Sequence, residues 1–318
     1  MIVRFGRRKF FPVILSILLL SGAVNSQDLA TFRADIAEVR IDVQVADRGK
    51  PITGLTVSDF HVYDQDVLQS VSRFGREADP LALVLLLDVS GSMKRYVRQM
   101  GSTAQNALTY LTPEDRVSVV AFSRDTEVLS EFTNKFDEVQ REIEVGIEEH
   151  SLSSGTAIYN AVKLAAGQLQ DQARKTPNIR RGVIILTDNE SLNYQITEKQ
   201  VMESLFSADA VLNAIVAGKA NRPKAPKAGE YRNPDFTPTD IFKIAEETGG
   251  EAFQVDRADK VFPILMERMR NRYSLVYKAP SGGAPGEFRK IRVELTPDAK
   301  RKYPKATVRA RSGYYTAF

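Results

Sequence analysis

Apolar and polar residues follow two different patterns along the chain, one at its ends and one in its middle. Near both ends the two kinds of residue alternate, which is the pattern of β-strands with one buried face. These stretches are residues 39–45, 273–277, 289–295 and 307–311. In the middle, continuous apolar runs alternate with helical patterns. The runs are residues 81–87, 117–122, 182–186 and 211–216, and the predicted helices include 94–111, 156–169 and 198–208.

These patterns predict an α/β domain between two β segments. Strands that alternate with helices favour a doubly wound, Rossmann-like domain with a mostly parallel central sheet, here at residues 79–272. The β segments at 27–78 and 273–318 each have too few strands for a stable sheet of their own. We therefore expect the two segments to form one β-sandwich, with the α/β domain inserted between them.

The first apolar run of the α/β domain ends in a polar turn. Asp88 closes the run, and Ser90 and Ser92 follow it, so one carboxylate and two hydroxyls lie within five residues. Hard cations such as Mg²⁺ prefer oxygen ligands of this kind, whereas zinc and copper favour nitrogen or sulfur. The turn is therefore a candidate metal site, although Asp-x-Ser-x-Ser also occurs in ordinary turns because Asp and Ser bond to their own backbone.

Two later segments offer further oxygens. Thr156 follows Gly155 at the start of a predicted helix, and Asp188 follows the buried run at 182–186. Because the carboxyl ends of parallel strands meet at one edge of a sheet, where open α/β sheets bind their ligands, we expect these side chains to approach Asp88. A single threonine at a helix start is also a common helix cap, which is the alternative role for Thr156.

In this order, the residues closely resemble the metal-ion-dependent adhesion site of the von Willebrand factor A domain, with its D-x-S-x-S, a distant T and a distant D. The resemblance implies that Asp88, Ser90 and Ser92 contact a divalent cation directly or through water. It also implies that Thr156 joins when a ligand binds, and that Asp188 holds a metal-bound water. A protein partner would supply the missing oxygen from an acidic side chain.

The resemblance has one departure and one extension. The third motif often continues as T-D-G-x-D, whereas Thr187 and Asp188 are followed here by Asn189, so the loop shape and ligand preference can differ. Residues 43–74 and 288–315 are similar to the VWFA-related family of the acidobacterial type, through V-x-V-x-D-x-G-x-P-I-x-G-L, D-F-x-V and the ending S-G-Y-Y. The resemblance thus covers nearly the whole chain after its first segment.

That first segment, residues 1–26, has the form of a signal peptide: a cationic start, an apolar stretch and then small residues. We expect cleavage before Gln27 and a secreted or periplasmic, cell-envelope location, without a membrane span after cleavage. An uncleaved anchor is the alternative, and the paired arginines Arg7 and Arg8 also fit twin-arginine export. The chain has no cysteine, so neither a lipoprotein anchor nor disulfides are available to it.

The charge and the motifs of the chain disfavour two further classes of function, nucleic-acid binding and hydrolysis. Four of the 44 basic residues lie in the signal segment, so the rest carries 40 basic and 40 acidic residues, and nucleic-acid binding is disfavoured. We expect the remaining local basic stretch, Arg289 to Arg292, on a solvated strand face. His61 and His150 belong to no zinc-hydrolase array, and Ser90 lacks the context of a nucleophile elbow.

The sequence therefore predicts metal-dependent protein binding without catalysis. Mg²⁺ is the expected ion, while the same oxygens accept Mn²⁺ or Ca²⁺. Two alternatives stay open: a scaffold that uses the metal for stability alone, and a hydrolase that the motifs do not reveal.

Overall fold

The computed structural model describes residues 38–76, 80–150, 155–191, 196–218, 222, 239–255, 260–281 and 284–316. The predicted signal peptide lies outside the described residues. The chain from Ile36 to Phe318 forms one compact unit. In the part of it that is described, we find no helix with the length and apolar character that crossing a membrane requires.

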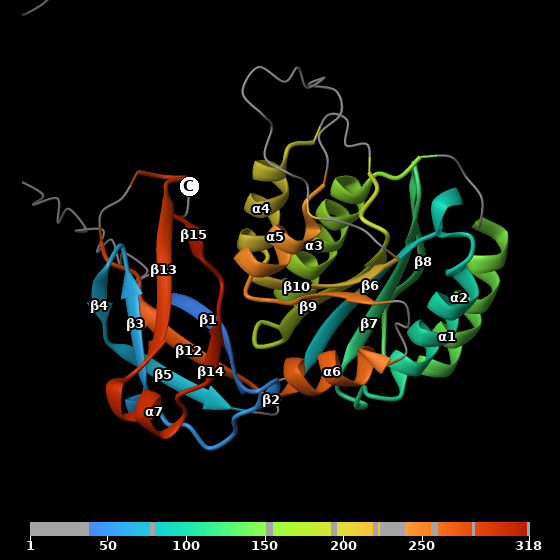
Figure 1. Cartoon of the computed structure of the whole chain (residues 1–318). Coiled ribbons are helices and arrows are strands. Elements are labelled where there is room, and N and C mark those ends of the chain that lie inside the picture. The colour runs from blue at the N-terminus through green and yellow to red at the C-terminus, as the bar shows by residue number, and fades with distance from the viewer. Residues whose placement is uncertain are drawn as a thin grey trace, which may run out of the picture. The chain divides into compact units, whose positions relative to one another are not determined.

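The centre of the α/β part is a six-stranded sheet in the order β11-β10-β9-β6-β7-β8 (Figure 1). Five of its strands run parallel to one another, and β8 is antiparallel to β7. The strands are β6 (Leu81–Asp88), β7 (Arg116–Phe122), β8 (Thr126–Thr133), β9 (Arg180–Thr187), β10 (Ala210–Ala217) and β11 (Ala252–Val255). An α/β fold, predicted from the alternation of runs and helices, is confirmed.

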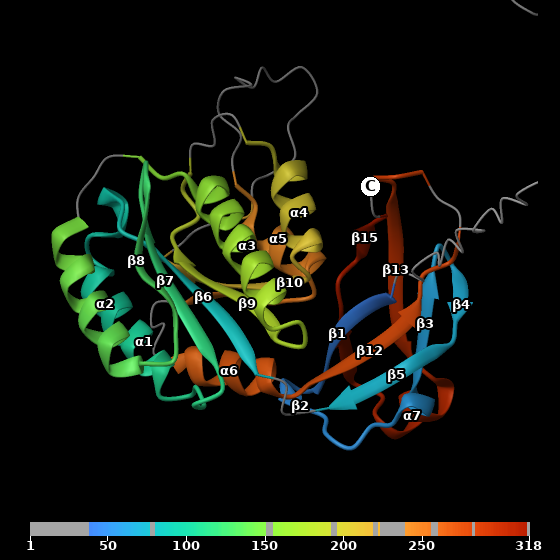
Figure 2. The same ribbon diagram turned by 180° about the vertical axis from the view of Figure 1, so that it is seen from behind.

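Helices cover both faces of this sheet because its strands are apolar on both sides (Figures 1 and 2). All eight residues of β6 are buried. One face packs on α3, α4 and α5 and the other on α1, α2 and α6. These helices are α1 (Val97–Leu108), α2 (Phe136–His150), α3 (Ile158–Lys175), α4 (Glu198–Ser207), α5 (Ile241–Glu247) and α6 (Phe262–Arg270).

Two elements of this part were not predicted. The edge strand β8 has no fully buried position, so its sequence lacks the apolar run that marks the inner strands. The helix α2 places Val139, Ile143 and Ile147 on the core, at the spacing of one helix face, between mostly charged residues. The predicted helix at 94–111 begins later than expected because the short helix η2 (Gly91–Met93) precedes α1.

Strands from the two ends of the chain share two further sheets. One has the order β14-β1-β12-β5, with β2 beside β1, and the other has the order β15-β13-β3-β4. Their inner side chains form a third apolar cluster. The elements are β1 (Glu38–Asp47), β2 (Lys50–Pro51), η1 (Val57–Asp59), β3 (Phe60–Asp64), β4 (Val67–Gln69), β5 (Val71–Arg76), β12 (Arg272–Lys278), β13 (Phe288–Leu295), α7 (Pro297–Lys302), β14 (Ala306–Arg309) and β15 (Gly313–Tyr315).

Arg289 is not on a solvated strand face, contrary to our expectation. Its side chain is 11% exposed and pairs with Asp64 at 2.8 Å. Asp64 is fully buried and also accepts hydrogen bonds from Tyr277 and Tyr314, at 2.8 and 2.9 Å. The side chain of Arg289 is turned away from solvent because the fold brings this partner, more than 200 residues away in sequence, to the neighbouring strand β3.

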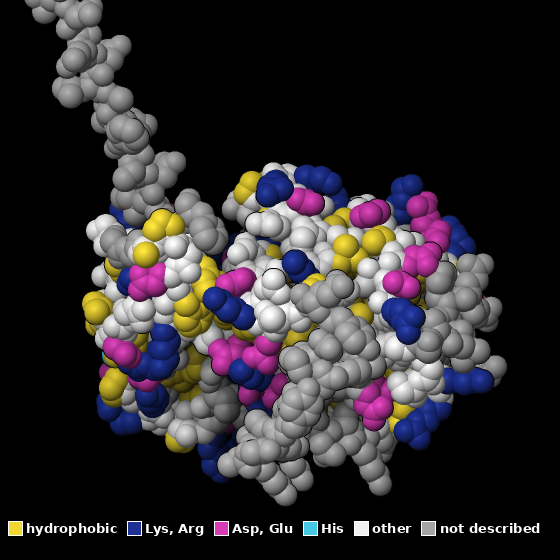
Figure 3. Space-filling model, turned by 90° about the horizontal axis from the view of Figure 1, so that it is seen from above, with side chains coloured by type: hydrophobic (Ala, Val, Ile, Leu, Met, Phe, Trp, Pro, Cys, Tyr) yellow, Lys and Arg dark blue, Asp and Glu magenta, His cyan; other side chains and the backbone are white. Residues whose placement is uncertain are grey.

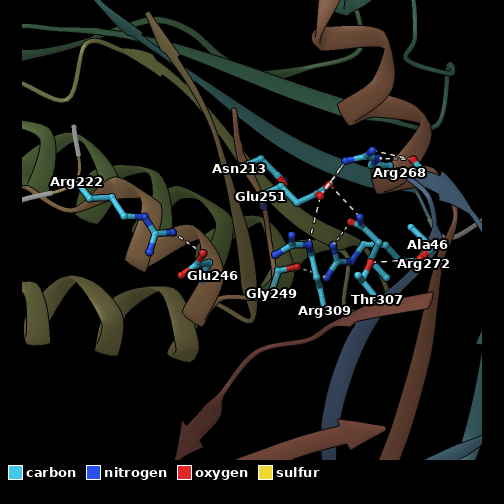
Figure 4. Close-up of polar contacts among 12 residues, drawn as sticks. Ala46, Asn213, Arg222, Glu246, Gly249, Glu251, Arg268, Arg272, Thr307 and Arg309 are labelled. Atoms are coloured by element: carbon cyan, nitrogen blue, oxygen red, sulfur yellow. Dashed lines mark hydrogen bonds and ion pairs between the residues drawn. The ribbon is translucent and has the colours of Figure 1, made fainter. Parts of the chain in front are cut away.

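Buried polar groups join the β sheets to the α/β part around Glu251 (Figure 4). Its carboxylate accepts from Arg268 at 2.8 and 2.7 Å, and from Gln44 at 2.9 Å. Arg309 lies 3.2 Å from the same carboxylate. Arg272 donates to Gln44 at 3.1 Å and to the carbonyl of Gly249 at 2.8 Å, so β1, β12 and β14 all reach this cluster.

A second ion pair crosses the same junction. Asp42 of β1 lies 3.4 Å from Arg180 of β9. Burial alone would raise the pKa of Asp42, but the charges of Arg180, Arg40 and Arg272 outweigh it and lower this pKa from 3.8 to about 2. The carboxylate is therefore held in its ionised form by the arginines around it.

Candidate metal centre

The first three predicted site residues lie together where β6 ends. Asp88 is the last residue of the strand and is fully buried, Ser90 is 2% exposed, and Ser92 is exposed in η2. Ser90 donates its backbone N–H to Asp88 Oδ1 at 3.0 Å. The hydroxyls of Ser90 and Ser92 are 3.2 Å apart. The turn thus gathers one carboxylate and two hydroxyls.

The neighbouring strand β9 orients Asp88 through Thr187. The Thr187 hydroxyl donates to Asp88 Oδ2 at 2.6 Å and accepts from the backbone N–H of Asn189 at 3.1 Å. Thr187 was assigned no role in the sequence analysis. Its position directly before Asp188, at the end of a buried run, could have indicated that it belongs to the site. Because a carboxylate offers about four lone-pair sites, the hydrogen bonds from Ser90 and Thr187 leave Asp88 with capacity for a cation.

Asp188 supplies a second carboxylate beside the first. It is 8% exposed, and its Oδ1 accepts the backbone N–H of Glu190 at 3.0 Å. The pKa of Asp88 is raised from 3.8 to about 7, mainly by burial and in part by the charge of Asp188, while the hydrogen bonds from Ser90 and Thr187 act in the opposite direction. The charge of Asp188 disfavours the ionised form of Asp88, and a cation bound here would relieve that repulsion.

Thr156 lies in a loop that is tied to the other site loops. The backbone N–H of Ala157 donates to the carbonyl of Ser123 at 2.7 Å, and the Ser191 hydroxyl donates to the carbonyl of Thr156 at 2.9 Å. The N-cap of α3 is Ala157, without a side-chain cap, so Thr156 lies one residue before the position of a capping residue. Gly155 precedes it with φ of +94°, a conformation that favours glycine.

The residues present fit a hard divalent cation. The candidate donors are the carboxylates of Asp88 and Asp188 and the hydroxyls of Ser90, Ser92 and Thr156, all of them oxygens. Within the described ranges, no three His, Cys, Asp or Glu side chains gather as a metal-binding group. The candidate centre therefore combines few charged ligands with neutral hydroxyls, which is the kind of set that leaves ligand positions to water or a partner.

Comparison with protein families finds a match to the middle of the chain. Residues 83–190 match the family model of the von Willebrand factor type A domain, so the matched range begins in β6 and ends just after Asp188. A comparison with curated protein sequences finds no match.

Comparison with solved structures finds similar chains from several sources. One is an aerotolerance-related membrane protein from Bacteroides fragilis, with 18% identity over 59% of this chain and 98% of that chain and a TM-score of 0.46. A von Willebrand factor type A protein from Catenulispora acidiphila has 12% identity over 90% of this chain and 76% of that chain, with a TM-score of 0.46. Proximal thread matrix protein 1 from the mussel byssus, with a zinc-occupied MIDAS motif, has 15% identity over 65% of this chain and 50% of that chain, with a TM-score of 0.47.

Proposed function

We propose that this chain, which contains a von Willebrand factor type A domain, binds a divalent cation and, through it, a protein partner. The observation that carries the proposal is the Asp88 cluster. A buried carboxylate is fixed by Ser90 and Thr187 and lies beside a second carboxylate, at the end of the sheet where parallel strands present ligands. The cation would supply positive charge that attracts an acidic group of the partner.

Each residue has a distinct part in this proposal. Asp88, Ser90 and Ser92 hold the ion directly or through water, and Asp188 holds a water on it. Thr156 joins when the partner binds, as the resemblance to the adhesion site implies, and its loop is hydrogen-bonded to Ser191 in the loop that follows Asp188. Thr187 acts through Asp88, whose orientation its hydroxyl fixes.

The location and the domain division are further parts of the proposal. We place the α/β domain at residues 79–272, inserted into a β-sandwich formed by 27–78 and 273–318, and we place the chain outside the cytoplasm after cleavage of residues 1–26. The pairing of β1 with β12 and β14 supports the sandwich, since it joins strands from both ends of the chain. The partner is a protein rather than nucleic acid.

The test is cation titration by calorimetry on the full chain, with Mg²⁺, Mn²⁺, Ca²⁺ and Zn²⁺ in turn. Asp88→Ala should abolish saturable binding while the protein stays folded, because Asp88 lies at a strand end outside the apolar clusters. Thr187→Val should weaken binding by about 10–100-fold, the usual cost of losing a residue that orients a ligand. Asp298→Ala, at an exposed side chain in α7, is the matched control.

A second experiment separates the alternatives. Partner capture from an envelope extract should require Mg²⁺ and should be lost in chelator and in Thr156→Ala, while thermal unfolding of the chelated protein stays cooperative. Unfolding on chelation would instead indicate a metal with a stabilising role alone. Equal capture by Asp88→Ala, Thr156→Ala and wild type would refute metal-dependent adhesion.

A further inference from the structure

A groove of about 790 Å³ lies between the β sheets and the amino-terminal end of β9. One side is the outer face of the sheet that contains β1, β12 and β5, where Arg40, Val276 and Arg73 are partners across three neighbouring strands. The other side includes Arg181 and Asp209 from the α/β part. A cavity of this size, at a junction within a protein, has the dimensions of a ligand site.

The groove contains more positive than negative groups. Its lining includes four arginines and two carboxylates: Arg40, Arg73, Arg181, Arg311, Glu38 and Asp209. Glu38 pairs with Arg73, and both of these side chains are largely exposed. Asp209 is shared by Arg181 and Arg311, at 2.6 and 3.1 Å. One carboxylate thus faces two guanidinium groups, which leaves a local excess of positive charge.

The two arginines on Asp209 also have unused hydrogen-bonding capacity. Their side chains are only 12% and 11% exposed, for Arg181 and Arg311 respectively. The Nε atom of each is buried without a hydrogen-bond partner. These Nε atoms are enclosed by protein, so an incoming carboxylate would meet the parts of Arg181 and Arg311 that line the groove, where charge-assisted hydrogen bonds to guanidinium groups are strong.

Aromatic side chains lie beside these arginines. Tyr314, Tyr315 and Phe206 line the groove, and the rings of Phe206 and Tyr315 are 6.2 Å apart. Tyrosine and arginine together are typical of the residues that carry most of the binding energy at protein interfaces. A nucleic acid is a poorer fit, because Glu38 and Asp209 within the groove would repel successive phosphates.

We propose that this groove binds an acidic peptide segment of a partner protein, with carboxylates on the arginines and apolar side chains on the aromatic rings. The site is separate from the candidate metal centre. Arg181 is the second residue of β9 and Thr187 is the last, so the two sites lie about 20 Å apart at the usual rise per residue of a strand. Binding in the groove therefore needs no cation.

The probe is a fluorescein-labelled octapeptide of alternating glutamate and phenylalanine, titrated with the full chain and followed by fluorescence anisotropy in chelator. Saturable binding is expected, and a peptide with lysine in place of glutamate should not bind. Arg73→Glu should weaken binding at least about fivefold, because it reverses a groove charge on an exposed side chain. Arg301→Glu makes the same change on an exposed side chain of α7, outside the groove, and should have no effect.

Arg311→Lys tests the buried pair, since it keeps the charge but removes the planar guanidinium, and it should weaken binding about tenfold. If this variant fails to fold, Arg73→Glu still decides the proposal. Equal affinities for Arg73→Glu and Arg301→Glu would overturn it, as would the absence of binding in the wild type. Displacement of the peptide by oligothymidine at equal concentration would also overturn it, because the groove would then accept any polyanion. Binding that survives chelator but is lost in Arg73→Glu is independent of the metal centre.

Discussion

The polar cluster around Glu251 lies where the β sheets meet the α/β part, and we expect it to contribute to the stability of the folded chain. Glu251→Ala removes the carboxylate that accepts from Arg268 and Gln44 and lies 3.2 Å from Arg309. The side chains of Glu251 and Arg268 are only 11% and 12% exposed, so water cannot replace the lost partner. Arg268 would keep its bonds to the carbonyl of Gly49 and its position over the ring of Phe253, but it would have no carboxylate partner in place of Glu251.

The expected loss of folding stability follows from the burial of Glu251 and Arg268. Removing one partner of a buried ion pair destabilises a protein by about 3–5 kcal/mol, because the other charge is left unpaired. For a chain of this size, each kcal/mol lowers Tm by about 2–4 °C, so Glu251→Ala should lower Tm by roughly 6–20 °C. Arg268→Ala should cost a similar amount. The double variant should cost less than the sum of the two, by about 1–3 kcal/mol, because the two side chains are in direct contact.

Thermal and urea unfolding of the single and double variants measure these values. The exposed pair Arg301–Asp298 gives the matched control, and Asp298→Ala should cost less than about 1 kcal/mol. The loss for Glu251→Ala should be the same with Mg²⁺ and with chelator, since the cluster does not include the candidate metal ligands. A cost below about 1 kcal/mol for Glu251→Ala, or additive costs in the double variant, would refute the reasoning.

Two further predictions concern Asp42 at the same junction and two glycines of the α/β part. The folded-state pKa of Asp42, about 2, lies below its ordinary 3.8, so its stabilisation of roughly 2 kcal/mol is present above pH 4 and lost as pH falls toward 2. Asp42→Asn should remove that part of the acid dependence in unfolding measured from pH 5 to 2, and an unchanged pH profile would contradict it. A Cβ on Gly250 would lie 1.9 Å from the backbone oxygen of Leu212, whereas the one close contact of a Cβ on Gly182 would be with the flexible end of Met269, at 2.4 Å. Gly250→Ala should therefore cost at least about 3 kcal/mol and clearly more than Gly182→Ala, as measured by urea unfolding; equal costs would contradict this.

The sequence predicted those strands and helices whose burial leaves a clear apolar pattern in their own residues. The run at 81–87 is apolar throughout because β6 is covered on both faces. This continuous apolar run is enough to predict a buried strand. The same run places Asp88 at the strand end, so the candidate turn was visible without a structure. In contrast, β8 is an edge strand whose residues are partly exposed, and its sequence does not distinguish it from a loop.

The candidate site was predicted less completely than its strands. Asp88 and Asp188 stand out because each follows an apolar run, but the hydrogen bond from Thr187 to Asp88 joins residues 99 positions apart and depends on β6 and β9 being neighbours. Thr156 lies one residue before the helix cap because α3 begins at Ile158. The exact first residue of a helix is the feature that a sequence pattern predicts least well.

The polar side of β1 shows why the remaining contacts could not be predicted. Alternation at 39–45 indicates a strand with one buried face, and polar residues on the other face are normally solvated. Here Gln44 is 3% exposed and the side chain of Asp42 is 14% exposed, because that face meets Arg180, Arg272 and Glu251. The partners of Asp42 and Gln44 lie 138 to 228 residues away in sequence, so the pattern of residues around β1 does not indicate these contacts. Charge complementarity between distant segments therefore determines this junction, and it becomes visible only when the fold has placed both sides.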